Sequence, residues 1–383
     1  MDRALWRSAR GPLALATAVA LVACGGSTAT EPPDVATATP SSTRPAAFAS
    51  EKPEASPDPN NAPRDLTGTL DPAFLPIEDV QGIALDGATA WVTAIRSETI
   101  TVFDLAGTRL DRSFEVDGRP HGLAVLDGTL WAVDSGGRSL LRIDPQADLV
   151  VAEIKVPAGR VPRAVAAGAG ALWLASNGTG EVVRIDPTTN EIVATINGGG
   201  INTNRLTDVL FAFDRVWTID ATAGSVLEID PGSNSVVRTH ADLGAVNSTT
   251  SSDAAGALRL AADDTVVWVL SEVASGRRAT ALFSIDPVSG ATVKVVELPL
   301  GPDPGGLPGL LVDSRGGAWI ALDERLVRVA LAERRADTVH TDISVHFSTL
   351  VELDGRVWFG MASSFDSSIS GLYGVQLSRI TGS

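Results

Sequence analysis

Cysteine, lysine and tyrosine are nearly absent from this sequence, and each shortage limits what the chain can be. Cys24 is the only cysteine, so no internal disulfide bond can form. Lysine occurs only at positions 52, 155 and 294, so arginine supplies almost all of the positive charge. Acidic residues outnumber basic ones by 46 to 30, which gives a net charge of -16. We expect no nucleic-acid partner, because phosphate binding requires clustered lysine and arginine.

Motifs of common catalytic and metal sites are also missing. Of the four histidines, His240, His340 and His346 show no spacing typical of metal ligands. There is no Walker loop, dinucleotide fingerprint, EF-hand loop or nucleophile elbow. We therefore expect no catalytic residues, no metal and no cofactor.

A single long apolar run, Leu13–Ala23, lies at the N-terminus and follows Arg3, Arg7 and Arg10. As a helix it would rise only about 16 Å, too short for a membrane core of about 30 Å. Residues 1–23 are therefore predicted to be a signal peptide.

The end of this run, Leu21-Val22-Ala23-Cys24-Gly25-Gly26, resembles the lipobox of bacterial lipoproteins. The resemblance implies a diacylglyceryl group on the thiol of Cys24, cleavage before this residue, and acylation of the new amine. Two or more acyl chains anchor a protein stably in a membrane, whereas one does not. We expect a protein of the cell envelope, anchored by lipid outside the cytoplasm; the alternative is a buried free thiol.

Residues 24–65 are rich in Ser, Thr, Pro and Ala and lack apolar periodicity. Such a segment cannot bury enough apolar surface to offset the entropy of ordering, so it is predicted to be a disordered tether. Residues 66–383 are predicted to form one folded domain.

Within that domain, Gly122–Val156 contains four short apolar runs separated by Gly-, Asp- and Pro-rich turns. This pattern indicates a four-stranded antiparallel meander, and such a unit must repeat to bury its faces. Tryptophan marks seven copies, at positions 91, 131, 173, 217, 268, 319 and 358. We expect an all-β fold, a seven-bladed β-propeller of four-stranded antiparallel blades, with the tryptophans packed between blades. The last copy lacks a fourth strand, and Leu66–Leu70 is predicted to supply it.

The copies "LWAV…LLRIDP" and "LWLAS…VVRIDP" resemble the seven-bladed propellers of the YVTN and virginiamycin B lyase-like type. Resemblance to WD40 and Kelch repeats is weaker, because no Trp-Asp ends the third strand and Tyr373 is the only tyrosine. The resemblance implies the fold strongly and the function weakly, since such propellers include binding proteins, scaffolds, sensors and a few enzymes.

Ligands of propellers usually bind at the mouth of the central channel. The residue that begins each innermost strand is predicted to lie ten positions before the tryptophan, which gives Gln81, His121, Arg163, Thr207, Leu258, Gly309 and Ser348. Arginines near this ring could hold a carboxylate or phosphate, or could instead pair with nearby aspartates. The candidate ligand-binding residues are Arg119, His121, Arg163, Arg205, Asp208, Gln81 and Asp134.

These observations favour a monomeric, non-catalytic binding or scaffold module, with a protein or small anionic ligand at the channel mouth. The alternative is a metal-dependent lyase resembling virginiamycin B lyase. That resemblance implies a magnesium ion and a histidine base, but no local motif assigns either of them to a residue of this chain.

The lipid anchor gives a first prediction. Replacing Cys24→Ser removes the acceptor thiol, so incorporation of a labelled fatty acid should fall to background and the protein should leave the membrane fraction. Undiminished labelling of the variant would contradict the anchor.

Overall fold

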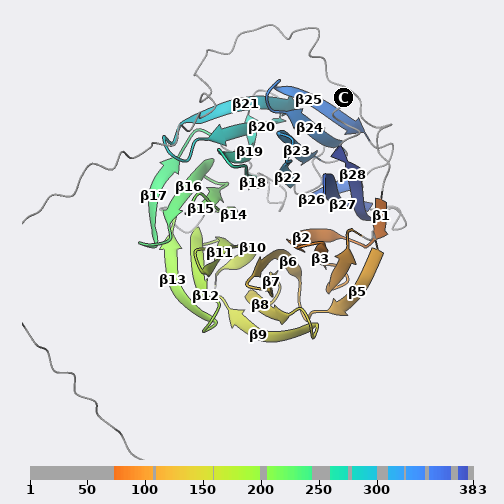
Figure 1. Cartoon of the computed structure of the whole chain (residues 1–383). Coiled ribbons are helices and arrows are strands. Elements are labelled where there is room, and N and C mark those ends of the chain that lie inside the picture. Colours follow the sequence, from red (N-terminus) through yellow and green to blue (C-terminus); the bar gives the residue numbers. More distant parts are fainter. Residues whose placement is uncertain are drawn as a thin grey trace, which may run out of the picture. The chain divides into compact units, whose positions relative to one another are not determined.

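In the computed structural model, seven four-stranded antiparallel sheets surround a central axis in chain order, as Figure 1 shows. The structure describes residues 73–106, 109–157, 159–198, 205–243, 259–274, 278–299, 309–322, 325–340, 345–363 and 370–377. The predicted signal peptide and tether lie outside these ranges. Among the described residues, no helix is long and apolar enough to span a membrane.

The first four blades follow one pattern, with the first strand innermost and the fourth outermost. Blade 1 comprises β2 (Val80–Asp86), β3 (Thr89–Ala94), β4 (Thr99–Asp104) and β5 (Arg109–Glu115). Blade 2 comprises β6 (Pro120–Leu126), β7 (Thr129–Asp134), β8 (Ser139–Asp144) and β9 (Leu149–Lys155). Blade 3 comprises β10 (Val161–Gly168), β11 (Ala171–Asn177), β12 (Glu181–Asp186) and β13 (Glu191–Asn197). Blade 4 comprises β14 (Leu206–Ala212), β15 (Arg215–Asp220), β16 (Ser225–Asp230) and β17 (Ser235–His240).

Blades 5 and 6 keep this order. Blade 5 comprises β18 (Arg259–Ala262), β19 (Val267–Ala274), β20 (Arg278–Ile285) and β21 (Thr292–Pro299). Blade 6 comprises β22 (Gly309–Val312), β23 (Gly317–Leu322), β24 (Arg325–Ala330) and β25 (Arg335–His340).

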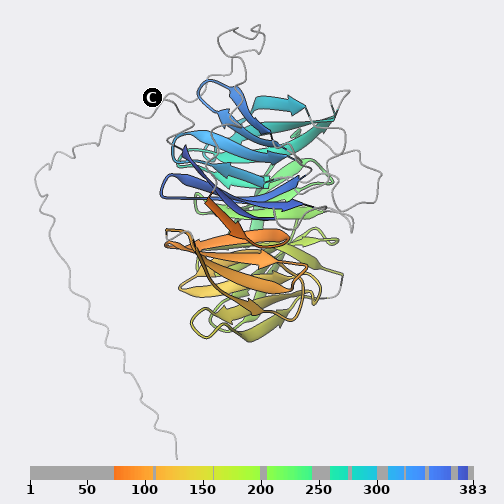
Figure 2. The same cartoon turned by 90° about the vertical axis from the view of Figure 1, so that its right-hand side faces the viewer.

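Blade 7 is built from both ends of the domain. Its order is β26 (Val345–Leu353), β27 (Arg356–Ser363), β28 (Gly371–Gln376) and then β1 (Ala73–Pro76), so an N-terminal strand closes the ring. Figure 2 shows the first blade, in orange, beside the dark-blue strands of the last. Closure by an N-terminal strand agrees with the sequence prediction, but the strand itself is later than predicted: Leu66–Leu70 lies outside the described residues. Phe74 and Leu75 pair with Tyr373 and Leu372, which sets this register.

The seven tryptophans all lie in the second strands of their blades, as the repeat predicts. They are buried, with 0–5% of each side chain exposed, and they pack in apolar clusters that join neighbouring blades. Burial of about 200 Å² of indole contributes roughly 5 kcal/mol before the entropy of ordering is subtracted. The tryptophan layer therefore supplies much of the contact between blades.

An arginine lies over the indole in several blades. In blade 3 the guanidinium of Arg184 is 5.0 Å from the ring centroid of Trp173. The same group donates to the side-chain oxygen of Asn234 and to the carbonyl of Pro231, both at 2.8 Å, in the turn of the next blade. Similar links join blade 1 to blade 2 and blade 2 to blade 3, through Arg112–Asp148 and Arg142–Asn190. We call this repeated contact the arginine clamp.

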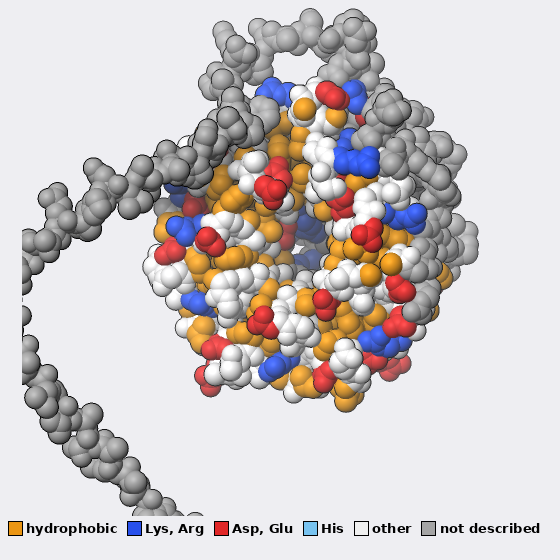
Figure 3. Space-filling model, viewed as in Figure 1, with side chains coloured by type: hydrophobic (Ala, Val, Ile, Leu, Met, Phe, Trp, Pro, Cys, Tyr) orange, Lys and Arg blue, Asp and Glu red, His pale blue; other side chains and the backbone are white. Residues whose placement is uncertain are grey.

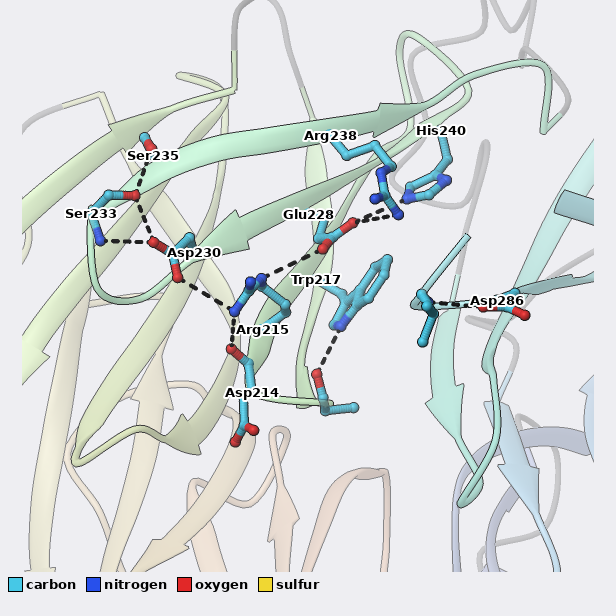
Figure 4. A network of polar contacts seen from close by, with 12 residues as sticks. Asp214, Arg215, Trp217, Glu228, Asp230, Ser233, Ser235, Arg238, His240 and Asp286 are labelled. Atoms are coloured by element: carbon cyan, nitrogen blue, oxygen red, sulfur yellow. Dashed lines mark hydrogen bonds and ion pairs between the residues drawn. The ribbon is translucent and has the colours of Figure 1, made fainter. Parts of the chain in front are cut away.

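Blade 4 has an acidic residue in place of the clamp arginine. Glu228 pairs with Trp217 across β15 and β16, whereas blades 2 and 3 have arginine at this position. This carboxylate is 5% exposed and is approached by Arg215 at 3.5 Å and Arg238 at 3.4 Å, as Figure 4 shows. The ring of His240, 5.6 Å from that of Trp217, covers the indole instead of an arginine. Blade 4 has no arginine at this position, and instead Arg215 in β15 and Arg238 in β17 supply positive charge next to the buried Glu228.

A second prediction concerns the tryptophan layer. Trp131 is fully buried, so Trp131→Ala should leave a cavity and lower the free energy of unfolding by about 3–5 kcal/mol, measured by urea denaturation. The indole N–H of Trp131 makes no hydrogen bond, so Trp131→Phe is the matched control and should cost clearly less. An unchanged denaturation midpoint for the alanine variant would contradict a role in blade packing.

Candidate functional site: the central cavity

Irregular pairing at the start of the innermost strands positions the candidate site. In β10 the ladder passes from Pro162 to Ala164, so the register shifts at Arg163, which lies in a bulge. The same irregularity frees Gln81 in β2, His121 in β6 and Thr207 in β14 from the ladder. A β-bulge turns a side chain away from the regular alternation, which here directs these residues toward the channel.

The bulges are held by close contact between adjacent blades. The hydroxyl of Thr93 in blade 1 donates to the carbonyl of His121 in blade 2 at 2.7 Å. Gly82 must be glycine here, because a Cβ atom would lie 2.4 Å from that same carbonyl oxygen. The same restriction recurs one blade on, where a Cβ at Gly122 would lie 2.8 Å from the carbonyl of Arg163. Innermost strands can therefore approach closely enough to enclose a narrow cavity.

The bulged residues line a central cavity of about 240 Å³. Five residues of the predicted ring are among its lining: Gln81, His121, Arg163, Thr207 and Gly309. Leu258 and the side chain of Ser348 lie outside the described part of the chain, and the adjacent Arg259 and Thr349 line the cavity in their blades. Counting ten residues back from tryptophan thus finds the cavity wall.

Positive charge gathers in this cavity although the chain is strongly acidic. Arg163, Arg205 and Arg259 contribute guanidinium groups from the consecutive blades 3, 4 and 5. Figure 3 shows blue basic atoms in the central hollow. Guanidinium groups bind carboxylate and phosphate through paired hydrogen bonds, so this wall suits an anion.

Two titratable groups report on the electrostatics of the cavity. Burial, followed by the nearby guanidinium groups of Arg163, Arg119 and Arg259, lowers the pKa of His121 to about 4. Burial also raises the pKa of Asp208, which carries the single carboxyl group among the described residues that line the cavity. Its oxygens accept backbone N–H groups of Val209 and Leu260, both at 2.9 Å. The cavity therefore presents a neutral imidazole and a carboxylate that is already held by backbone donors.

The structure brings together five of the seven candidate residues and leaves two outside the cavity lining. Asp134 is 2% exposed and accepts the backbone N–H groups of Arg119, Gly136 and Gly137 at 2.8–2.9 Å. It thereby fixes the loop between β7 and β8, as Asp220 does with Thr222 and Ala223 in blade 4. The side chain of Arg119 is exposed and lies over Gly136. Asp134 thus has a structural role, and Arg119 is near the cavity without lining it.

Arg259 and Asn177 line the cavity but were not candidates from the sequence. Arg259 follows directly after the predicted ring position of blade 5, and the described part of β18 pairs with β19 without a bulge. A one-residue search around each ring position would have found it. Asn177 comes from the end of a second strand and bridges to Arg205, which no count from tryptophan indicates.

The described part of the lining does not fit a divalent cation. Magnesium prefers several oxygen ligands and carboxylates, whereas the described lining residues offer one carboxyl group among three guanidinium groups. Within the described ranges, no three His, Cys, Asp or Glu side chains form a group that could hold a metal ion.

No protein-family model matches the sequence, and no curated protein does either. Solved structures do resemble the fold. Virginiamycin B lyase from Staphylococcus aureus is 14% identical with a TM-score of 0.61, and the match covers 79% of this chain and 97% of that one. Hydrazine synthase of Kuenenia stuttgartiensis is 15% identical with a TM-score of 0.62, covering 78% of this chain and 96% of that one. The Pan2 WD40 domain of Neurospora crassa is 11% identical with a TM-score of 0.57, covering 78% and 88%. At such identities the likeness shows the β-propeller fold alone.

The lowered pKa of His121 predicts a pH dependence of stability. In the unfolded chain this histidine titrates near 6.5, so its contribution to stability is complete above that pH and is lost as the pH falls to about 4. Between pH 7 and pH 4.5 the wild-type protein should lose up to about 3 kcal/mol more than His121→Asn, measured by urea denaturation at each pH. Equal losses in the two proteins would contradict a buried neutral imidazole.

Proposed function

We propose that this protein is a non-catalytic binding module whose ligand site is the central cavity of the propeller. The observation that carries the proposal is the set of three guanidinium groups that line this cavity in a chain of net charge -16. Arginine that is partly removed from water binds anions more strongly than exposed arginine does, because the surrounding dielectric constant is lower. The ligand is therefore a small anion or an anionic group of a partner.

The proposal includes display of the propeller at the cell envelope. Cys24 carries the lipid, residues 24–65 act as the tether, and the propeller lies outside the cytoplasm as a monomer. The support is the lipobox-like segment around the only cysteine of the chain. A tethered module of this kind would hold its ligand or partner close to the membrane.

Catalysis is the competing function, since three of the similar structures are lyases. A general base works best when its pKa lies near the working pH, and that of His121 is about 4. Among the described lining residues, Asp208 carries the one carboxyl group, and its oxygens accept backbone hydrogen bonds. These groups support binding better than proton transfer.

Thermal denaturation in the presence of small anions tests the binding role. Phosphate at constant ionic strength should raise the melting temperature above that in chloride, because a ligand that binds the folded state stabilises it. Arg163→Gln combined with Arg205→Gln should remove this increase. Arg96→Ala is the matched control, because Arg96 lies in a loop with 81% of its side chain exposed and does not line the cavity.

Two results would contradict the proposal. One is an anion-induced shift that persists in the double variant, which would place binding elsewhere. The other is ring-opening of a streptogramin substrate that is lost both on addition of EDTA and in His121→Ala, which would make the protein a lyase.

A further inference from the structure

Next to the ring of bulged residues, which includes Gln81, His121 and Arg163, a second set of residues lines the cavity. One or two residues after the ring position, an apolar residue of six innermost strands also lines the cavity. This apolar layer comprises Ile83, Leu123, Val165, Leu260, Leu310 and Leu350. Ile83 and Leu123 are half-buried, whereas the other four are buried. An apolar wall contributed by six blades therefore lies next to the ring of polar and cationic groups.

The charged residues of the cavity lining lie on one side of the cavity. The arginines and Asp208 come from blades 3 to 5, whereas the described lining of blades 6, 7 and 1 contains no charged residue. On that side the polar groups are the amide of Gln81 and the hydroxyl of Thr349. The cavity thus combines a cationic side, an uncharged side and an apolar layer.

A fully hydrated inorganic anion complements only the first of these surfaces. Inorganic phosphate would leave the apolar layer facing water, and the free-energy cost of this exposure grows with the apolar area exposed. A molecule with an anionic head and an apolar body would satisfy the guanidinium groups and cover Ile83 and Leu123 together. At about 240 Å³ the cavity is smaller than the roughly 300–1,000 Å³ of sites for drug-sized ligands, so this molecule is small.

We infer that the cavity binds a small aliphatic carboxylate, with its head at the arginines of blades 3 to 5 and its chain against the apolar layer. This inference rests on the proposed function and specifies its ligand class. A planar carboxylate matches the fork of a guanidinium group, and its short chain excludes water from the leucine and isoleucine side chains.

Isothermal titration of the Cys24→Ser chain with acetate, butyrate, hexanoate and inorganic phosphate tests the ligand class. Each added CH₂ should tighten binding roughly fourfold until the cavity is filled, and hexanoate should bind more tightly than phosphate. Ile83→Ala and Leu123→Ala should weaken hexanoate several-fold and leave acetate unchanged. Arg163→Gln should weaken every carboxylate, and Arg96→Ala should weaken none.

The outcomes separate this inference from the function on which it rests. Equal affinity for all chain lengths, or tighter binding of phosphate than of hexanoate, would overturn the carboxylate assignment and leave an anion-binding cavity. Failure of every anion to bind would overturn both. Should Ile83→Ala or Leu123→Ala fail to fold, the chain-length series with the Cys24→Ser chain and the smaller change Ile83→Val still decide the question.

Discussion

The propeller depends on one repeated contact, the packing of a buried tryptophan between neighbouring blades. No blade can bury both faces alone, so each relies on the next one for its core. The arginine clamp adds a hydrogen bond between blades to this apolar contact. Arg184 lies over Trp173 of blade 3 and donates to Asn234 of blade 4. β1 then completes the last blade by pairing with β28, so that the N-terminal strand and the last strands of the domain belong to one sheet.

The same contacts set the geometry of the cavity. Buried tryptophans pack the blades against one another, and glycine at positions 82 and 122 lets the innermost strands of neighbouring blades approach closely. Bulges in β2, β6, β10 and β14 then release one or two residues from the ladder, and these residues line the cavity. Different positions of one repeat therefore build the ring and the cavity: the tryptophans pack the blades together, and the bulged residues line the cavity.

Fold and site differ in how far the sequence alone predicts them. Tryptophan marks all seven copies and an Asp-Pro turn marks four of them, so architecture and ring positions follow from periodicity. The strand that closes the ring could not be identified from periodicity. The predicted segment Leu66–Leu70 and the observed β1 are both short, and the choice depends on pairing with β28. Arg259 was missed because β18 has no bulge in its described part, and Arg119 was included because sequence distance does not tell which way a rim side chain turns.

An anomalous-diffraction experiment on a crystal soaked in bromide tests the central claim, that the propeller encloses an anion site, most directly. Bromide reports on anion binding without assuming the shape of the natural ligand. We expect the strongest anomalous peak in the central cavity, within contact distance of the guanidinium groups of Arg163, Arg205 and Arg259. Bromide found only on the outer surface, or a metal ion bound in the cavity, would contradict this claim.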